Sequence, residues 1–198
     1  MDLFLPPEES EKAAGILTEN FGALPPRLMA FHTTGSDPYK WWPAASFIEL
    51  GNFLYEKYQA SLLIISGASD RPQAEAIAAK LSGPTLVTGG RYSLLTVAAL
   101  LSHCRLLVAN DSGPLHMGLA LKVPTIALIG ADDPRRVGPY GVDWGNSLHK
   151  REEVCDRQPC LLKKCPENRC LTAITVSEVV KLIREWWEPR WLGDRGRS

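Results

Sequence analysis

The chain has 198 residues, 45% of them hydrophobic and 22% charged, which is enough for one domain with a substantial core. Lysine plus arginine and aspartate plus glutamate number 22 each, and this balance argues against a protein drawn to nucleic acid or anionic lipid by its charge. No apolar run approaches the ~18 residues of a membrane span, and the first residues lack the basic segment that opens a secretory signal. We therefore expect a cytoplasmic protein.

Short apolar runs alternate along the chain with segments of helical spacing. The runs predict buried parallel strands at Leu28–Phe31, Leu62–Ile65, Leu86–Thr88, Leu106–Ala109 and Thr125–Ile129. The intervening segments predict helices over Pro43–Tyr58, Gln73–Leu81, Ser93–Ser102 and Pro114–Leu121. Repeated strand-then-helix units are typical of a parallel sheet covered on both faces. The predicted fold is α/β, a Rossmann-like doubly wound domain.

The two ends of the chain differ from this core. Residues 1–26 hold one helical stretch, Glu8–Asn20, between two Pro-Pro pairs, and we interpret them as an interdomain linker and lead-in helix. Residues 27–198 form the predicted domain. Within it, residues 150–171 are expected to be an irregular, cysteine-rich loop, and a last helix is predicted over 176–187.

The densest polar chemistry lies where the predicted fourth strand ends. In open α/β sheets, ligands bind outside the carboxyl ends of the strands. Here a turn rich in polar residues leads into a helix, whose free N–H groups and dipole attract an anion. Gly113 lets a phosphate approach the backbone, and His116 lies one turn further on. The alternative is that Asp111 or Ser112 only caps the helix and that His116 is a satisfied, partly buried histidine.

A second polar loop follows the predicted first strand. Thr33 and Thr34 supply hydroxyl groups, and Lys40 supplies a point charge that suits an anion. The alternative is a solvated Ser/Thr/Gly loop. Because carboxyl ends of parallel strands share one edge of the sheet, the two loops together favour a common phosphate-bearing ligand.

Three elements together resemble glycosyltransferase family 9, the heptosyltransferases. They are Asn110–His116, the stretch Val123–Gly130 with Asp133–Gly141, and Lys40–Phe47. The resemblance implies a GT-B architecture, in which two Rossmann-like domains face each other and this chain is the C-terminal, donor-binding half. It implies transfer of heptose or a related sugar from an ADP-sugar to lipopolysaccharide core or a related lipid-linked glycan. The alternative function is a non-catalytic nucleotide- or nucleotide-sugar-binding module.

The resemblance also implies roles for individual residues. The donor diphosphate would contact Thr33, Thr34 and Lys40. The donor pocket at the fourth strand would be lined by Asp111, Ser112, Gly113 and His116. Ser69 stands near the place where the family has a glutamate for the ribose hydroxyls, so base preference stays open. The family's general base lies in the N-terminal acceptor domain, so this chain is expected to hold no catalytic base and to need that domain in cis or in trans.

No cofactor is required on this view. The adjacent pair Asp132 and Asp133 offers metal-binding chemistry, as in glycosyltransferases that hold a divalent ion. The resemblance implies instead that Lys40, backbone N–H groups and the helix N-terminus stabilise the leaving diphosphate without a metal.

Five cysteines are unevenly placed. Cys104 stands alone in an apolar stretch and is expected to be a buried structural thiol. Cys155, Cys160, Cys165 and Cys170 recur at five-residue intervals, unlike the paired CxxC motifs of structural zinc sites. Free structural thiols, a Zn²⁺ or iron–sulfur centre, and disulfides are the three alternatives.

The last residues are rich in tryptophan and arginine. Trp186, Trp187 and Trp191, with Arg184 and Arg190, suit a membrane interface, which would place the protein peripherally at the inner membrane near a lipid-linked acceptor. The alternative is that they pack against the N-terminal domain or a neighbouring chain.

Overall fold

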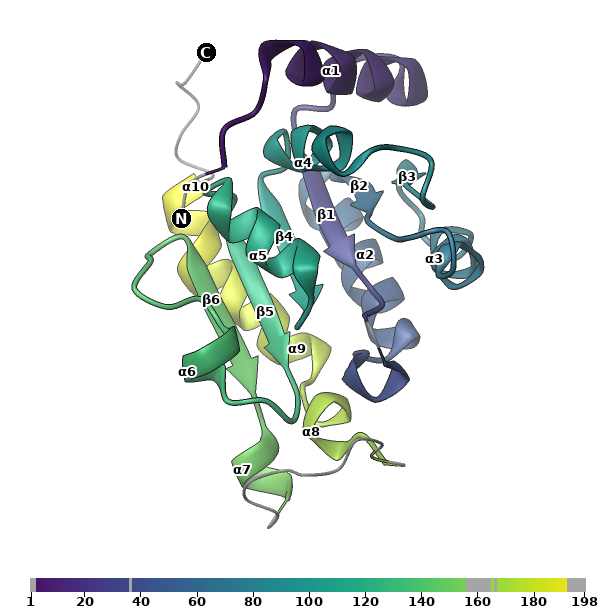
Figure 1. Ribbon diagram of the computed structural model, residues 1–198. Coiled ribbons are helices and arrows are strands. Elements are labelled where there is room, and N and C mark those ends of the chain that lie inside the picture. Colours follow the sequence, from purple (N-terminus) through teal and green to yellow (C-terminus); the bar gives the residue numbers. More distant parts are fainter. Residues whose placement is uncertain (1–2, 36, 156–164, 166, 192–198) are drawn as a thin grey trace.

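The computed structural model describes residues 3–35, 37–155, 165 and 167–191 (Figure 1). Within these residues, six parallel strands form one sheet of order β3-β2-β1-β4-β5-β6. The strands are β1 (Leu28–His32), β2 (Ser61–Ile64), β3 (Thr85–Val87), β4 (Leu106–Asn110), β5 (Thr125–Ile129) and β6 (Gly145–His149). The order reverses between β1 and β4, which is the topological switch point of a doubly wound sheet. The predicted Rossmann-like α/β fold is confirmed.

Helices cover both faces of the sheet. One face carries α2 (Ala44–Tyr58), α3 (Arg71–Ala78), α9 (Val176–Leu182) and the π-helical turn η2 (Ile183–Trp187), which runs on into α10 (Glu188–Trp191). The other face carries α1 (Pro7–Phe21), α4 (Leu94–Ser102) and α5 (Gly113–Ala120). The short elements η1 (Pro38–Lys40), α6 (Pro134–Val137), α7 (Arg151–Val154) and α8 (Arg169–Thr172) lie at the carboxyl ends of the strands (Figure 1).

Alternate residues of each central strand feed two separate cores. Phe31, Val108 and Leu128 point into the core beneath α2 and α9. Their neighbours in sequence, such as Ala30 and Ala109, point into the core beneath α1, α4 and α5. This alternation follows from the two-residue period of a strand. Because both faces are buried, the strands read as continuous apolar runs rather than alternating ones.

Local sequence sets where several helices begin and end. The Ser93 hydroxyl accepts the N–H of Thr96 and so caps α4. Thr175 and Glu178 form a capping box at the start of α9, each side chain accepting the other's backbone N–H. At the end of α2, Gln59 adopts the left-handed conformation, with φ 54°, and the chain turns toward β2.

The structure differs from the sequence predictions in two features. The strand β6 was not predicted. The last helix does not end at 187 but continues through α10, so the predicted tail begins later. The predicted lead-in helix is α1, which packs on α4 with Ala13 and Leu17 fully buried. The linker role of residues 1–26 stays a prediction. No helix of the described residues is long and apolar enough to cross a membrane.

Candidate functional site

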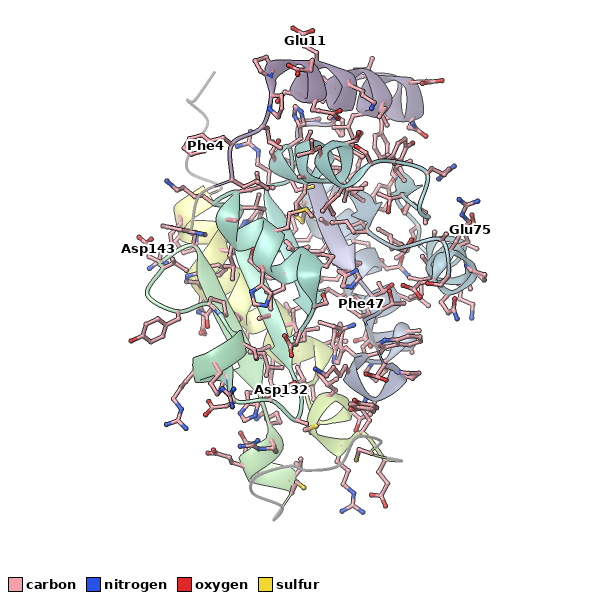
Figure 2. The ribbon with its side chains drawn as sticks, in the orientation of Figure 1. Phe4, Glu11, Phe47, Glu75, Asp132 and Asp143 are labelled. Carbon is pink, nitrogen blue, oxygen red and sulfur yellow. The ribbon has the colours of Figure 1, made fainter. Side chains whose placement is uncertain are left out.

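Lysine 40 bridges two strand ends at the switch-point edge of the sheet. Its Nζ lies 2.8 Å from Oδ2 of Asp132 and 3.5 Å from Oδ2 of Asp111. Asp111 directly follows β4, and Asp132 follows β5, where Figure 2 shows it beyond the lower end of the strand. One cation therefore faces two carboxylates, so it is not free to receive an anion without giving up a partner.

The surroundings shift these three ionisable groups in different directions. The hydrogen bond to Asp132 is the main cause that raises the pKa of Lys40. Burial raises the pKa of Asp111, and the nearby carboxylate of Asp132 adds to that rise. The hydrogen bond from Lys40 lowers the pKa of Asp132. Lys40 and Asp132 thus form the charged pair at neutral pH, while Asp111 is the carboxyl that most readily takes up a proton.

The loop after β1 brings its hydroxyl groups to the same edge. Thr33 is buried, and its Oγ1 has no hydrogen-bond partner among the described residues. Thr34 donates to Oδ2 of Asp70 at 3.2 Å, and Ser69 donates to the other carboxylate oxygen at 3.0 Å. Asp70, for which sequence analysis gave no role, thereby joins the loop after β2 to the loop after β1. A buried hydroxyl without a partner is the kind of group that a bound ligand or a water satisfies.

In the described part of the chain, no side chain caps the N-terminus of α5. Ser112 occupies the N-cap position but forms no side-chain cap, because its hydroxyl donates to the carbonyl oxygen of Asn110 at 3.0 Å. The structure therefore does not support the alternative in which Ser112 only caps the helix. A Cβ added at Gly113 would meet nothing within 4 Å, so the backbone there is accessible. His116, one turn into the helix, is exposed.

Two further residues shape the site without having been singled out for it. Asn110, the last residue of β4, is fully buried, and its side chain bonds to the backbone of Thr34 and of Trp42. His32, the last residue of β1, is buried beside the carbonyl oxygen of Ile65, with Nδ1 at 2.9 Å. Burial lowers the pKa of His32 and favours the neutral ring. The sequence shows that Asn110 and His32 directly follow predicted strands, but their hydrogen-bond partners depend on the fold.

Asp132 and Asp133 take different partners. Asp132 binds Lys40, whereas Asp133 accepts the backbone N–H of Arg135 and pairs with its guanidinium at 2.8 Å. These bonds hold the pKa of Asp133 at about 2. Within the described residues, no group of three or more His, Cys, Asp or Glu side chains is arranged to hold a metal ion.

The spaced cysteines are described only in part. Cys155 and Cys165 are half-buried, and Cys170 is buried against Gly130, while Cys160 lies outside the described residues. The three alternatives for this loop therefore stay open. Cys104 is buried, and burial raises the pKa of its thiol well above the ordinary value, as expected for a structural cysteine.

One tryptophan of the tryptophan-rich end does not lie where the sequence predicted. Trp187 belongs to the core: it is 2% exposed, and its Nε1 donates to the carbonyl oxygen of Arg105 at 2.7 Å. It is therefore not available to a membrane interface. Trp186 is partly buried, and the guanidinium of Arg190 lies 6.0 Å from the centre of its ring.

A model of glycosyltransferase family 9 (heptosyltransferase) matches residues 8–168. Lipopolysaccharide heptosyltransferase 1 of Pseudomonas aeruginosa is 34% identical over 127 residues, which make up 64% of this chain and 34% of that protein. The chain thus spans about a third of the length of this curated relative.

Solved structures share the fold. A family 9 glycosyltransferase from Veillonella parvula superposes with a TM-score of 0.79 at 21% identity, over 96% of this chain and 54% of that one. The Escherichia coli heptosyltransferase WaaC with ADP superposes with a TM-score of 0.64 at 24% identity, over 80% of this chain and 44% of that one. The likeness in structure concerns the fold, and the family match covers most of the sequence. The chain belongs to glycosyltransferase family 9.

Proposed function

We propose that this chain binds the nucleotide-sugar donor of a family 9 glycosyltransferase at the carboxyl ends of β1 and β4. The observation that carries the proposal is the position of Lys40, which lies over the ends of β4 and β5 beside the uncapped start of α5. A lysine ammonium and free helix N–H groups are the groups that bind phosphate oxygens. The solved relative with ADP is consistent with a nucleoside diphosphate as the ligand.

In this proposal, the diphosphate competes with carboxylates for Lys40. A phosphate oxygen replaces Asp132 or Asp111 as the partner of Nζ, and a second oxygen reaches the backbone at Gly113, where the space is open. The unpartnered hydroxyl of Thr33 donates to the ligand from the neighbouring loop. As the anomeric bond breaks, these groups stabilise the charge that develops on the leaving diphosphate.

The remaining donor residues surround this centre. Thr34 and Ser69 both bond to Asp70, so the ribose-side polar group is a cluster of hydroxyls around one carboxylate rather than a single glutamate. Ser112 and His116 face the donor from the start of α5, and Asp111, which directly precedes Ser112, lies 3.5 Å from Lys40.

The sugar and the acceptor follow from the relatives. The P. aeruginosa protein is a lipopolysaccharide heptosyltransferase, so we propose transfer of heptose or a related sugar from an ADP-sugar to lipopolysaccharide core or a related lipid-linked glycan. The acceptor-binding surface, and a base to deprotonate the acceptor hydroxyl, would come from an N-terminal domain in cis or in trans. On this proposal, the reaction takes place in the cytoplasm, at the inner-membrane surface where the acceptor lipid is presented.

Calorimetric titration with ADP and with adenosine tests the site. Lys40→Ala should weaken ADP binding about tenfold, the usual loss for one charge-assisted hydrogen bond, and leave adenosine binding within about twofold. Lys57→Ala is the matched control, since Lys57 is an exposed lysine at the opposite end of α2. Equal losses for both ligands would remove Lys40 from the diphosphate site.

A second experiment separates an enzyme from a binding module. The 198-residue chain should transfer no sugar alone but should do so when a matching N-terminal domain of a family 9 enzyme is added. Donor binding that persists without any transfer in that mixture would support the non-catalytic alternative.

A further inference from the structure

The side chain of Asn110 joins the two ends of the loop that carries Lys40. Its Oδ1 accepts the backbone N–H of Trp42 at 3.0 Å, and its Nδ2 donates to the carbonyl oxygen of Thr34 at 3.3 Å. Asn110 is fully buried at the end of β4, so both bonds lie in the interior of the protein. The loop between the two bonded residues therefore has both stems fixed to the neighbouring strand.

A carboxamide meets both demands at once. One end must accept a hydrogen bond and the other must donate one, and asparagine has both groups on a short side chain. An aspartate would keep the acceptor but lose the donor, and an alanine would leave both backbone groups unsatisfied in a buried place, which is costly. The residue type at position 110 is thus explained by the loop and not by the strand.

Two additional contacts hold the same loop. Nδ2 of Asn168, at the start of α8, donates to the carbonyl oxygen of Trp41 at 2.9 Å. The indole of Trp41 in turn donates to the carbonyl oxygen of Gly35 at 3.2 Å. Lys40 directly precedes this clamped pair of tryptophans, so the place of its Nζ depends on where the loop stems are fixed.

We infer that Asn110 is a positioning residue for Lys40, and that it acts on the donor diphosphate only through the loop. The inference rests on the proposed function of Lys40. One strand end then does two things: residue 110 fixes the loop, and residue 111 supplies a carboxylate to the lysine that the loop presents.

A double-mutant cycle tests this inference. Asn110→Ala is made in the wild-type chain and in Lys40→Ala, and ADP and adenosine are titrated into each protein. In the wild-type background, Asn110→Ala should weaken ADP binding about tenfold, the loss given by misplacing one charge-assisted bond, with adenosine within about twofold. In the Lys40→Ala background, Asn110→Ala should change the affinity for either ligand by no more than about twofold. The reason is that the effects of two coupled residues are not additive.

Asn52→Ala is the matched control. The Asn52 side chain also accepts a loop N–H, that of Ser82 at 2.8 Å, and donates to the carbonyl oxygen of Lys80 at 3.5 Å, but it lies on α2 away from the strand ends. It should leave binding of both ligands unchanged. Because the bonds of Asn52 are exposed, this variant controls for losing a bridging asparagine but not a buried one. A general destabilisation by Asn110→Ala would instead weaken adenosine binding together with ADP binding.

The outcomes separate the two proposals. If Lys40→Ala itself spares ADP binding, the proposed function fails. If Lys40→Ala weakens ADP binding but Asn110→Ala has no effect, or weakens ADP equally in both backgrounds, the positioning role is overturned. Hydrogen exchange on the wild-type chain needs no variant: the Trp42 amide should exchange slowly, and a rapidly exchanging amide would overturn the clamp whether or not the variants fold.

Discussion

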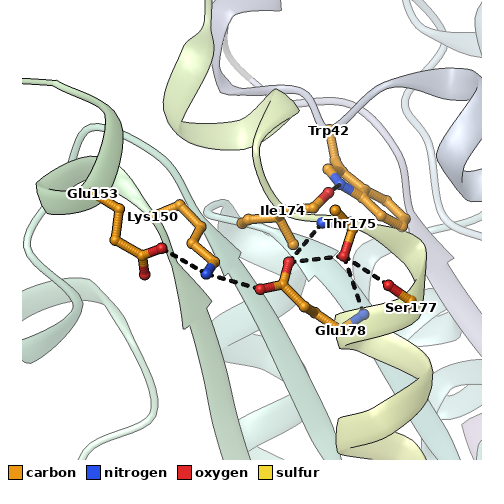
Figure 3. Close-up of polar contacts among 7 residues, drawn as sticks. All are labelled: Trp42, Lys150, Glu153, Ile174, Thr175, Ser177 and Glu178. Atoms are coloured by element: carbon orange, nitrogen blue, oxygen red, sulfur yellow. Dashed lines mark hydrogen bonds and ion pairs between the residues drawn. The ribbon is translucent and has the colours of Figure 1, made fainter.

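Trp42 and Ile174 are joined by a hydrogen bond of 2.8 Å from the indole Nε1 to the carbonyl oxygen, across 132 positions of sequence (Figure 3). The indole is 1% exposed and meets the ring of Phe47 edge to face at 4.9 Å. Ile174 directly precedes Thr175, the cap of α9. The tryptophan whose backbone is held by Asn110 thus also fixes the start of the last helix.

Replacing this tryptophan should cost stability. Trp42→Phe leaves the carbonyl of Ile174 without its buried donor and opens space beside Phe47, so we expect a loss of about 2–4 kcal/mol in the free energy of unfolding, measured in urea. Trp144→Phe is the control, because Trp144 makes a similar bond to the carbonyl of Leu119 at 3.0 Å but is only half-buried. A loss in Trp42→Phe no larger than in the control would contradict this role.

The capping box of α9 gives a second stability prediction. Thr175→Ala removes the oxygen that accepts the N–H of Glu178 and should lower the free energy of unfolding by about 1 kcal/mol. Ser177→Ala removes a neighbouring hydroxyl that does not cap the helix, and it should leave the free energy of unfolding nearly unchanged. Figure 3 shows both hydroxyls beside Glu178, whose other carboxylate oxygen pairs with Lys150 at 2.8 Å. Equal effects of the two variants would mean that the cap does not stabilise this helix.

His32 should make stability depend on pH. Burial lowers its pKa below the ordinary 6.5, so the unfolded chain binds more protons just below that pH. The contribution of His32 to the free energy of unfolding is complete above pH 6.5. It is lost as the pH falls from there through the pKa of His32 in the folded protein, and the free energy of unfolding then changes by at most about 1.4 kcal/mol per pH unit. His32→Gln keeps a donor for the carbonyl of Ile65 and should flatten this slope in urea titrations between pH 7 and 5.

His149 must be measured in parallel with His32. Burial also lowers the pKa of His149, so both histidines contribute in the same window. His149→Gln should remove only its own share of the slope. If His32→Gln keeps the wild-type pH profile, the ring of His32 is not held neutral by burial.

The ion pairs of Lys40 predict a variant that binds ADP more tightly. Asp132→Asn removes one of two carboxylates that face Lys40, which should make the site more positive and tighten ADP binding about fivefold at low salt. Adenosine binding should not change. Asp133→Asn, next in sequence but paired with Arg135, is the control and should leave ADP affinity nearly unaltered. Weaker ADP binding in Asp132→Asn would instead show that Asp132 holds Lys40 in place for the ligand.

The sequence predicted the central sheet because its strands are buried on both faces and therefore appear as apolar runs. β6 escaped detection for the opposite reason. Its five residues, Gly-Asn-Ser-Leu-His, contain one large apolar side chain and are all half-buried. The strand pairs with β5 at the edge of the sheet, where backbone hydrogen bonds hold it and side-chain burial contributes little.

The candidate site was predictable in part for a similar reason. Polar residues that follow predicted strands, such as Lys40 and Asp111, fall at one edge of the sheet once the fold is known. The partnership of Lys40 with Asp132 depends on where the loops after β1 and β5 travel, and no local pattern encodes that. Asn110 was visible only as part of a strand-to-helix motif, because its two partners lie 68 and 76 positions away.

The order of synthesis makes completion of one core depend on the helix that contains α9, η2 and α10. Val179, Ile183 and Trp187 emerge from the ribosome after all six described strands, yet they complete the core that contains Phe31 and Val108. A nascent chain that already has its sheet therefore carries an uncovered apolar face until this helix has left the ribosome. Such a face invites chaperones or self-association, so expression yield should respond more sharply to changes in this helix than to changes in α1.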